Sequence, residues 1–272
     1  MKTLLLSPTL DKISMLNTEL WFYLFANEEF NINMSRFSDN AKSLYTEDLF
    51  CKNKYAYRVS MQVKDLPKYQ VSNRTATMGS YFSMCYEILS SYIEELIKIV
   101  KSCNGINYRM SSACGPEDNL QRCLHKGNII QVNNNIINTI KYFRLLRNQI
   151  IHLSSTQSNA LRSLINSESA NLENYWQIQS PNNTLEFAKS EFNQYALDDI
   201  FEMIKLMRVC VQQIDSHVVV NINRNNMIRK VLEQYPLRLN SLSRPRKITK
   251  IQNHILNLIS LRLTEQEAQS CI

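Results

Sequence analysis

The chain contains very few residues that interrupt helices. Only 4 glycines and 6 prolines occur among its 272 residues, and these two residues form most of the sharp turns between short elements. Apolar residues make up 44% of the sequence, and in several long stretches they recur at the spacing of one helix face. We therefore predict a mostly α protein, an antiparallel helical bundle with a substantial core.

The periodicity divides the chain into three regions. Residues 1–74 form an N-terminal helical and extended region, residues 75–220 form the helical bundle, and residues 221–272 form a basic C-terminal helical segment. Residues 55–63 alternate large apolar with small or polar side chains, which is the period of a strand. Residues 55–71 can therefore form a short β-hairpin or an extended arm in an otherwise helical protein.

Helical spacing is clearest at four places. These are residues 9–26, 75–102, 133–155 and 185–219, the last as one long helix or two. Residues 103–127 contain three of the glycines, so we expect a loop-rich insertion there. Residues 154–183 are polar and rich in Ser and Asn, with one short helix at residues 160–165.

One stretch near the end of the helix predicted at residues 133–155 contains side chains that could catalyse a reaction. Residues 147–152 read Arg-Asn-Gln-Ile-Ile-His. An arginine can hold a phosphate through two parallel hydrogen bonds, and a histidine can exchange a proton near neutral pH. RNA supplies its own nucleophile in the 2′-hydroxyl, so Arg147 and His152 could together cleave RNA without a metal ion.

Arg147 lies on an otherwise apolar stripe of this predicted helix. A buried guanidinium needs an acid or an anion beside it, and Glu87 and Glu94 on a neighbouring helix are the candidate acids. The alternatives are an Arg147 that pairs within the core, a His152 that only caps the helix end, and glutamates that are merely solvated.

A second stripe of the same helix is polar and mostly basic. It consists of Lys141, Arg144, Asn148 and His152. We expect Lys141 and Arg144 to contact RNA phosphates beside the cleavage site.

Residues 146–152 resemble the signature of the HEPN superfamily (higher eukaryote and prokaryote nucleotide-binding). In that family's ribonucleases, four to six residues separate an Arg from a His, and Asn, Asp or His often follows the Arg. Here four residues intervene, and Asn148 follows Arg147. The resemblance covers residues 75–220 and implies a small antiparallel bundle with the motif near the end of a core helix.

The resemblance implies a metal-independent endoribonuclease that leaves a 2′,3′-cyclic phosphate and a 5′-hydroxyl. Arg147 would bind the scissile phosphate, and His152 would act as general acid or base. Asn148 would orient His152 or contact the phosphate. Family members often act as toxins or in abortive-infection defence against phage, so an antitoxin or a partner defence protein is an expected partner.

A homodimer follows from counting histidines. One motif supplies one histidine, whereas full acid–base catalysis uses two. The stripe around Arg147 also holds more apolar surface than one buried helix face needs. We therefore expect a two-fold homodimer, with a composite site at the ends of both motif helices.

Metal ions and cofactors are not expected. Cys103, Cys114, Cys123 and His125 could together hold zinc, but they lack the close cysteine pairs of structural zinc sites. Seven cysteines without regular spacing fit free thiols in a reducing cytoplasm. No apolar run approaches the length of a membrane span, and the apolar start is too short for a secretory signal. We therefore expect a cytoplasmic protein.

The positive charge of the chain is unevenly placed. Its net charge is +7, and residues 221–272 contain nine basic and three acidic residues, a difference of +6. Such a segment can follow a phosphate backbone, or it can be a solvated surface that aids solubility. Two alternatives to the enzyme therefore remain open. One is a non-catalytic helical module that binds RNA or a protein, and the other is a nucleic-acid-binding regulator that uses this basic segment.

Overall fold

The computed structural model describes residues 1–151, 158–239 and 242–271 of the chain. These residues form helices, turns and one isolated antiparallel bridge, without a strand among them. The mostly α fold is confirmed. The long helices are α1 (Leu6–Ser35), α5 (Leu66–Asn104), α7 (Asn134–Ile151), α8 (Asn159–Gln179), α9 (Leu197–Asn221) and α11 (Arg244–Ile259). The shorter helical segments are α2 (Asp39–Lys42), α3 (Thr46–Leu49), α4 (Ala56–Val59), η1 (Val63–Asp65), α6 (Pro116–Lys126), η2 (Phe192–Gln194), α10 (Arg224–Gln234) and α12 (Glu265–Gln269).

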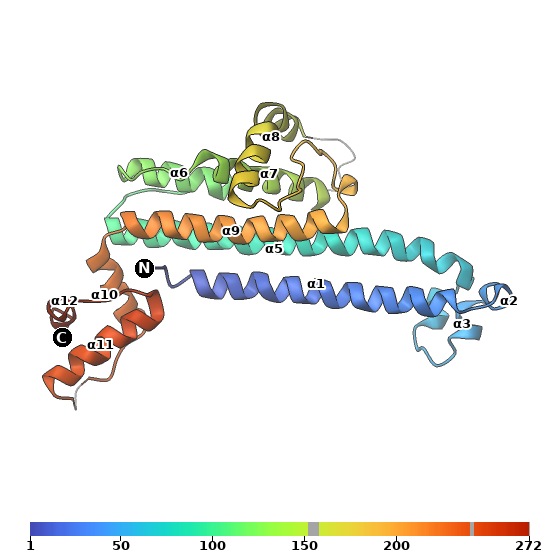
Figure 1. The fold of residues 1–272 in the computed structure, drawn as a ribbon, viewed down its shortest axis with the longest axis horizontal. Helices are drawn as coiled ribbons and strands as arrows, with labels where there is room; N and C mark the ends of the chain where they lie inside the picture. Colours follow the sequence, from blue (N-terminus) through green and yellow to red (C-terminus); the bar gives the residue numbers. More distant parts are fainter. Residues whose placement is uncertain (152–157, 240–241, 272) are drawn as a thin grey trace.

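The helices are arranged around a central pair. α5 and α9 lie side by side, and α1 packs against both of them along one side (Figure 1). α6 and α7 pack against α5 on the other side, and α8 packs on α7. α10 contacts one end of α5, and α11 and α12 follow it, so the C-terminal segment covers one end of the bundle.

α5 is central because its sequence supports a long helix with a wide apolar face. Phe82, Leu89 and Ile93 are fully buried at helical spacing. Pro67 lies in the first turn, where a missing N–H is no loss. Gly105 ends the helix in the left-handed conformation, with φ of 65°.

The N-terminal region belongs to the same packed body as the bundle. α1 is longer than the helix predicted at residues 9–26, and it buries Ile13, Leu16 and Leu20 beside α5 and α9. Residue 75, where we expected the bundle to begin, lies inside α5. The apolar spacing did not reveal the first turns of α5, because these turns are mostly exposed and polar.

The prediction of a β-hairpin or an extended arm near residues 55–71 is wrong. Residues 56–59 form α4, Ser60 adopts a left-handed turn with φ of 38°, and Gln62 makes a single bridge to Tyr45. Tyr55 and Tyr57, which suggested a strand, are 57% and 79% exposed. An alternating segment becomes a strand only where a neighbouring strand can pair with it.

The segments around the motif helix also differ from the predictions. The expected loop-rich insertion at residues 103–127 contains α6, whose two buried leucines escape notice among polar residues. The short helix expected at residues 160–165 is part of α8, which continues to Gln179. The helix expected from residue 185 begins at Leu197, because residues 181–196 form turns across the bundle instead.

Candidate active site at the end of the motif helix

Residues 147–151 of the motif form the last turn of α7. Ile136, Ile140 and Phe143 hold the helix to the core and are buried. Phe143 meets Phe82 of α5 edge to face, with ring centroids 5.9 Å apart. On the opposite flank, Trp176 of α8 donates a buried hydrogen bond of 2.8 Å to Thr139 Oγ1. These contacts fix the rotation of α7, and with it the direction of Arg147.

Arg147 lies at the edge of the buried face, as its place in the apolar stripe predicted. Its side chain is 25% exposed, and its guanidinium forms an ion pair with Glu87 of α5. One Nη atom also donates a hydrogen bond of 3.2 Å to the side-chain oxygen of Asn148. The buried Nε has no hydrogen-bond partner among the described residues. The arginine is therefore only partly satisfied.

Of the two candidate acids, Glu87 is the one that reaches Arg147. Its side chain is 51% exposed, so water can hydrate the carboxylate if the pair opens. Glu94, about two turns further along α5, is exposed. An ion pair this exposed contributes about 0–1 kcal/mol to stability.

Arg144 lies in a different environment from the RNA-facing position expected for it. Its Nε donates a hydrogen bond of 2.8 Å to Glu117 of α6, whose side chain is fully buried. Burial raises the pKa of the Glu117 carboxyl, although the Arg144 charge opposes this shift. Glu117 Oε2 has no hydrogen-bond partner among the described residues. Arg144 therefore neutralises a buried acid beside the motif.

Two other residues show how tightly this pair is enclosed. A Cβ atom at Gly115 would overlap the Glu117 carboxylate and the Nε of Arg144, so a larger residue there would have to displace this ion pair. Tyr86 of α5 is buried nearby, and its pKa is raised by burial and by the Glu117 charge. This cluster was not predicted from the sequence, because Glu117 lies in a segment that we expected to be a loop.

For two predicted site residues, Lys141 and His152, the structure gives little or no information on side-chain contacts. Lys141 is half-buried on α7, one turn before Arg144. His152 lies outside the described residues, as does the predicted helix end at residue 155. The described part of α7 ends at Ile151, next to His152 in the sequence.

The apolar stripe of α7 is used inside the chain. Ile150 contacts α5 at Gly79, where its Cγ2 lies 3.1 Å from the position of an added Cβ. Ile151, at 46% exposure, is the stripe residue that stays open to solvent within the described part of α7. Among the described residues, α7 therefore leaves little of the apolar surface from which we expected a dimer at the motif helices, and that dimer stays a prediction.

The zinc ligands considered from the sequence are not brought together. Cys103 and Cys123 are buried, Cys114 is half-buried and His125 is exposed. Nowhere in the described ranges do three or more His, Cys, Asp or Glu side chains group closely enough to hold a metal ion.

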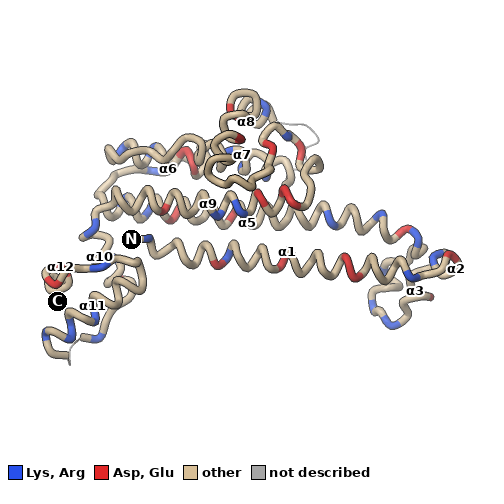
Figure 2. Tube along the Cα trace, in the orientation of Figure 1, with Lys and Arg blue, Asp and Glu red and all other residues tan. Residues whose placement is uncertain are grey.

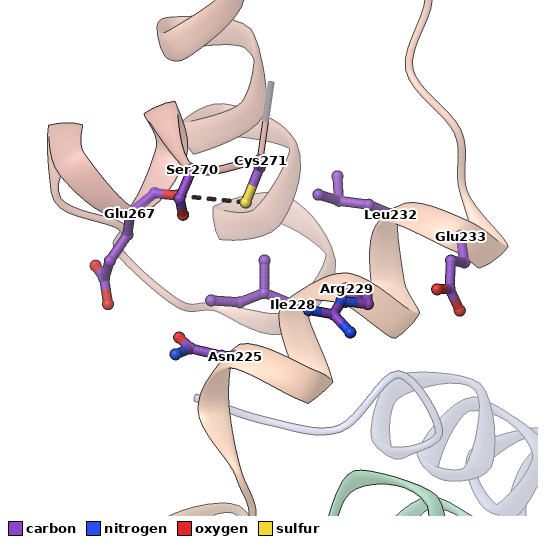
Figure 3. Close-up of a pocket in the computed structure, with 8 residues that line it drawn as sticks. All are labelled: Asn225, Ile228, Arg229, Leu232, Glu233, Glu267, Ser270 and Cys271. Carbon is purple, nitrogen blue, oxygen red and sulfur yellow. Dashed lines mark hydrogen bonds between the residues drawn. The ribbon is translucent and has the colours of Figure 1, made fainter.

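A separate pocket of about 530 Å³ lies between α10 and the C-terminal residues. Figure 3 shows Ile228 and Leu232 extending from α10 toward Cys271. The Cys271 thiol donates a hydrogen bond of 3.3 Å to the carbonyl of Glu267. Glu233 points away from the middle of the pocket (Figure 3). The pocket is therefore lined by apolar and polar side chains alike, with no convergent set of reactive groups among the residues described there.

Comparisons with known proteins give no relative. No protein-family model matches the chain, and neither a curated protein nor a solved structure is significantly similar to it. Among the described helices, none is both long enough and apolar enough to cross a membrane.

Proposed function

We propose that the chain is a metal-independent endoribonuclease whose site is built on Arg147, Asn148 and His152. The observation that carries the proposal is that the contacts of Arg147 contribute little to the stability of the fold. Its position on a buried face costs desolvation, while its partner Glu87 is half exposed and its Nε has no described partner. A guanidinium held in this way can exchange Glu87 for a phosphate at little cost.

The proposed reaction uses the chemistry of Arg147 and His152, and Asn148 would orient His152 or contact the phosphate. A scissile phosphate replaces the Glu87 carboxylate on Arg147 and accepts two parallel hydrogen bonds. His152 removes the proton from the 2′-hydroxyl, whose oxygen attacks phosphorus. The bond from phosphorus to the 5′-oxygen then breaks, and the leaving oxygen takes up a proton from the His152 imidazolium that the first proton transfer formed. The products are a 2′,3′-cyclic phosphate and a 5′-hydroxyl, while Arg147 stabilises the charge on the phosphoryl oxygens.

The buried ion pair between Arg144 and Glu117 supports this site by holding α7 in place. Arg144 and Glu117 join α7 to α6, one turn before Arg147. We propose that Arg144 positions the end of α7 and that Lys141 contacts the RNA backbone. Growth arrest through RNA cleavage, as a toxin or an effector of phage defence, is the setting that the HEPN resemblance suggests. Such an activity would need restraint by an antitoxin or a partner defence protein.

The test is cleavage of total RNA by the purified chain. We expect Arg147→Ala and His152→Ala each to lower cleavage by about 10²-fold or more while the protein stays folded. Arg74→Ala, at an exposed arginine of α5, is the matched control and should cleave like the wild type. Near wild-type cleavage by either motif variant would remove the proposed site.

Glu87 distinguishes phosphate binding from a structural ion pair. If Glu87 competes with phosphate for Arg147, Glu87→Gln should bind RNA more tightly and unfold at nearly the same denaturant concentration. If the pair is structural, Glu87→Gln should be destabilised and RNA binding should not tighten.

The metal-independent mechanism through the 2′-hydroxyl can be tested separately. Attack by the 2′-hydroxyl requires no added cation, so cleavage should persist in EDTA. It should disappear on a substrate with a single 2′-deoxy nucleotide at the cleavage position. A strict requirement for magnesium in the chemical step would assign the protein to another class of nuclease.

One observation favours the nucleic-acid-binding regulator as a second candidate. The N-terminal part of α11 contains Arg244, Arg246, Lys247 and Lys250, and its first turn has no acid. Positive charge is unfavourable at a helix N-terminus, and a bound phosphate would offset it. Basic residues recur along this segment (Figure 2). Salt-dependent binding that survives Arg147→Ala but is weakened by Arg246→Gln would favour this function.

A further inference from the structure

α1 carries apolar side chains on two opposite faces. Ile13, Leu16 and Leu20 face α5 and α9 and are buried. On the far side, Met15, Phe22, Phe25 and Ile32 are 62%, 71%, 63% and 37% exposed. A helix that is apolar on both sides is normally buried on both sides. We call the far side the outer seam of α1, defined by residues 15, 18, 22, 25, 29 and 32.

The outer seam has the spacing of a helix-pairing surface. Its positions are separated alternately by three and four residues, which is the heptad pattern of two helices that pack along their length. Four of the six positions are large and apolar, and the other two are Thr18 and Glu29. The natural occupant of this surface is therefore another helix.

The order of residues along the outer seam identifies that helix. Read in either direction, the seam runs apolar, polar, apolar, apolar, polar, apolar. A two-fold interface must be self-complementary, and this order meets the requirement for an antiparallel pair centred between Phe22 and Phe25. Phe22 then faces Phe25 of the second copy, and Met15 faces Ile32 of the second copy.

The polar and charged positions agree with the same register. Thr18 faces Glu29 of the second copy, so no like charges meet within the seam. One turn outside it, Asp11 comes opposite Arg36 of the second copy, and both residues are exposed in the single chain. Opposite charges at the two ends favour this register over a shifted one.

We propose that two copies of the chain pair antiparallel through the outer seams of α1. The contact is confined to about five turns of helix on each side, so it falls at the small end of specific interfaces. We expect a dissociation constant on the order of micromolar.

The proposed interface is independent of the proposed ribonuclease site. α7 packs on the other side of α5 from α1 (Figure 1). The dimer therefore leaves the ends of both α7 helices away from the interface, so it differs from the dimer expected at the motif helices. Failure of either proposal would leave the other standing.

The test measures the mass of the full chain in solution by sedimentation at 1–100 µM, a range set around the expected constant. We expect a monomer–dimer equilibrium in the wild type, and a monomer for Phe22→Glu combined with Phe25→Glu. Ile178→Glu replaces a side chain of 77% exposure on α8 and should dimerise like the wild type. A wild type that stays monomeric throughout this range overturns the proposal, as does a dimer that survives the double substitution with unchanged helicity.

A charge substitution tests the register. In the antiparallel pair, Thr18→Lys brings a lysine opposite Glu29 of the second copy, so dimerisation should tighten several-fold. Thr18→Glu should weaken it by a similar factor. In a parallel pair, Thr18→Lys would face itself and weaken the dimer, and this result would overturn the proposed pairing.

Discussion

At the residue scale, Asp215 shows how one buried carboxylate joins three distant segments. It lies on α9 and is 1% exposed. It accepts a hydrogen bond of 3.0 Å from the backbone N–H of Thr3 and one of 3.0 Å from the hydroxyl of Tyr92 on α5. The Thr3 hydroxyl is a third donor. The N-terminus is thereby tied to the central pair of helices.

Asp215 should make stability depend on pH. Burial raises the pKa of its carboxyl, although the hydrogen bonds from Thr3 and Tyr92 oppose the shift. A folded-state pKa above the unfolded value means that the folded chain binds the proton more tightly. The resulting stability is fully present below the unfolded pKa of about 4 and is lost as pH rises through the folded pKa.

Urea unfolding of the wild type and Asp215→Asn over a pH series measures this effect. Relative to the variant, the free energy of unfolding of the wild type should fall as pH rises from about 4 and then level off. Asp48→Asn, at an exposed acid, is the control. A constant difference between wild type and Asp215→Asn at every pH would show that Asp215 does not titrate in this window.

At the scale of elements, the position of the motif depends on one close approach between helices. Gly79 lets α5 approach the end of α7, where a Cβ at residue 79 would lie 3.1 Å from Ile150 Cγ2 and 3.4 Å from Phe192. A larger side chain must push Ile150 away, and Arg147 lies one turn before Ile150 on the same helix. The α5–α7 contact therefore couples core packing to the geometry of the candidate site.

Substitutions at Gly79 distinguish the effect of helix propensity on stability from the effect of the tight contact with α7. Gly79→Leu should lower the free energy of unfolding by about 1–3 kcal/mol through overpacking, and RNA cleavage should fall with it. Gly79→Ala should change stability by no more than about 1 kcal/mol, because the gain in helix propensity offsets the tight contact. Ser80→Leu places the same side chain at an exposed neighbour. Equal loss at residues 79 and 80 by chemical denaturation would contradict this explanation.

At the scale of the whole molecule, stability is distributed unequally. α5 and α9 are covered by α1, α6 and α7, whereas α11 and α12 pack mainly on each other and on α10. The backbone N–H of Lys2 donates a hydrogen bond of 2.8 Å to the carbonyl of Ile259, which links this end segment to the N-terminus. The C-terminal segment is therefore attached through fewer contacts than the central pair.

Hydrogen exchange should reveal this difference. Amides in the middle of α5 and α9 should exchange only through global unfolding, while amides of α11 and α12 should exchange at least about tenfold faster through local opening. Peptide-resolved exchange measured by mass spectrometry checks the order. Protection in α11 equal to that in α5 would mean that the molecule unfolds as a single unit.

Local sequence patterns determined much of this protein. Scarce glycine and proline, together with apolar spacing, specified a helical fold and placed α5, α7 and α9 within a few turns of their ends. The spacing also put Arg147 on an apolar face, where the structure has it. These properties follow from the 3.6-residue period and need no knowledge of the rest of the chain.

Only the tertiary structure decided which side chains have partners. The sequence presented Arg144 as a free cation, but α6 brings the buried Glu117 to it across 27 positions of the chain. From the sequence we also expected excess apolar surface on α7, whereas the chain buries most of that stripe and leaves the outer seam of α1 exposed. Periodicity identifies a face from neighbours within two turns, but the partner of that face is set by contacts between segments far apart in the chain.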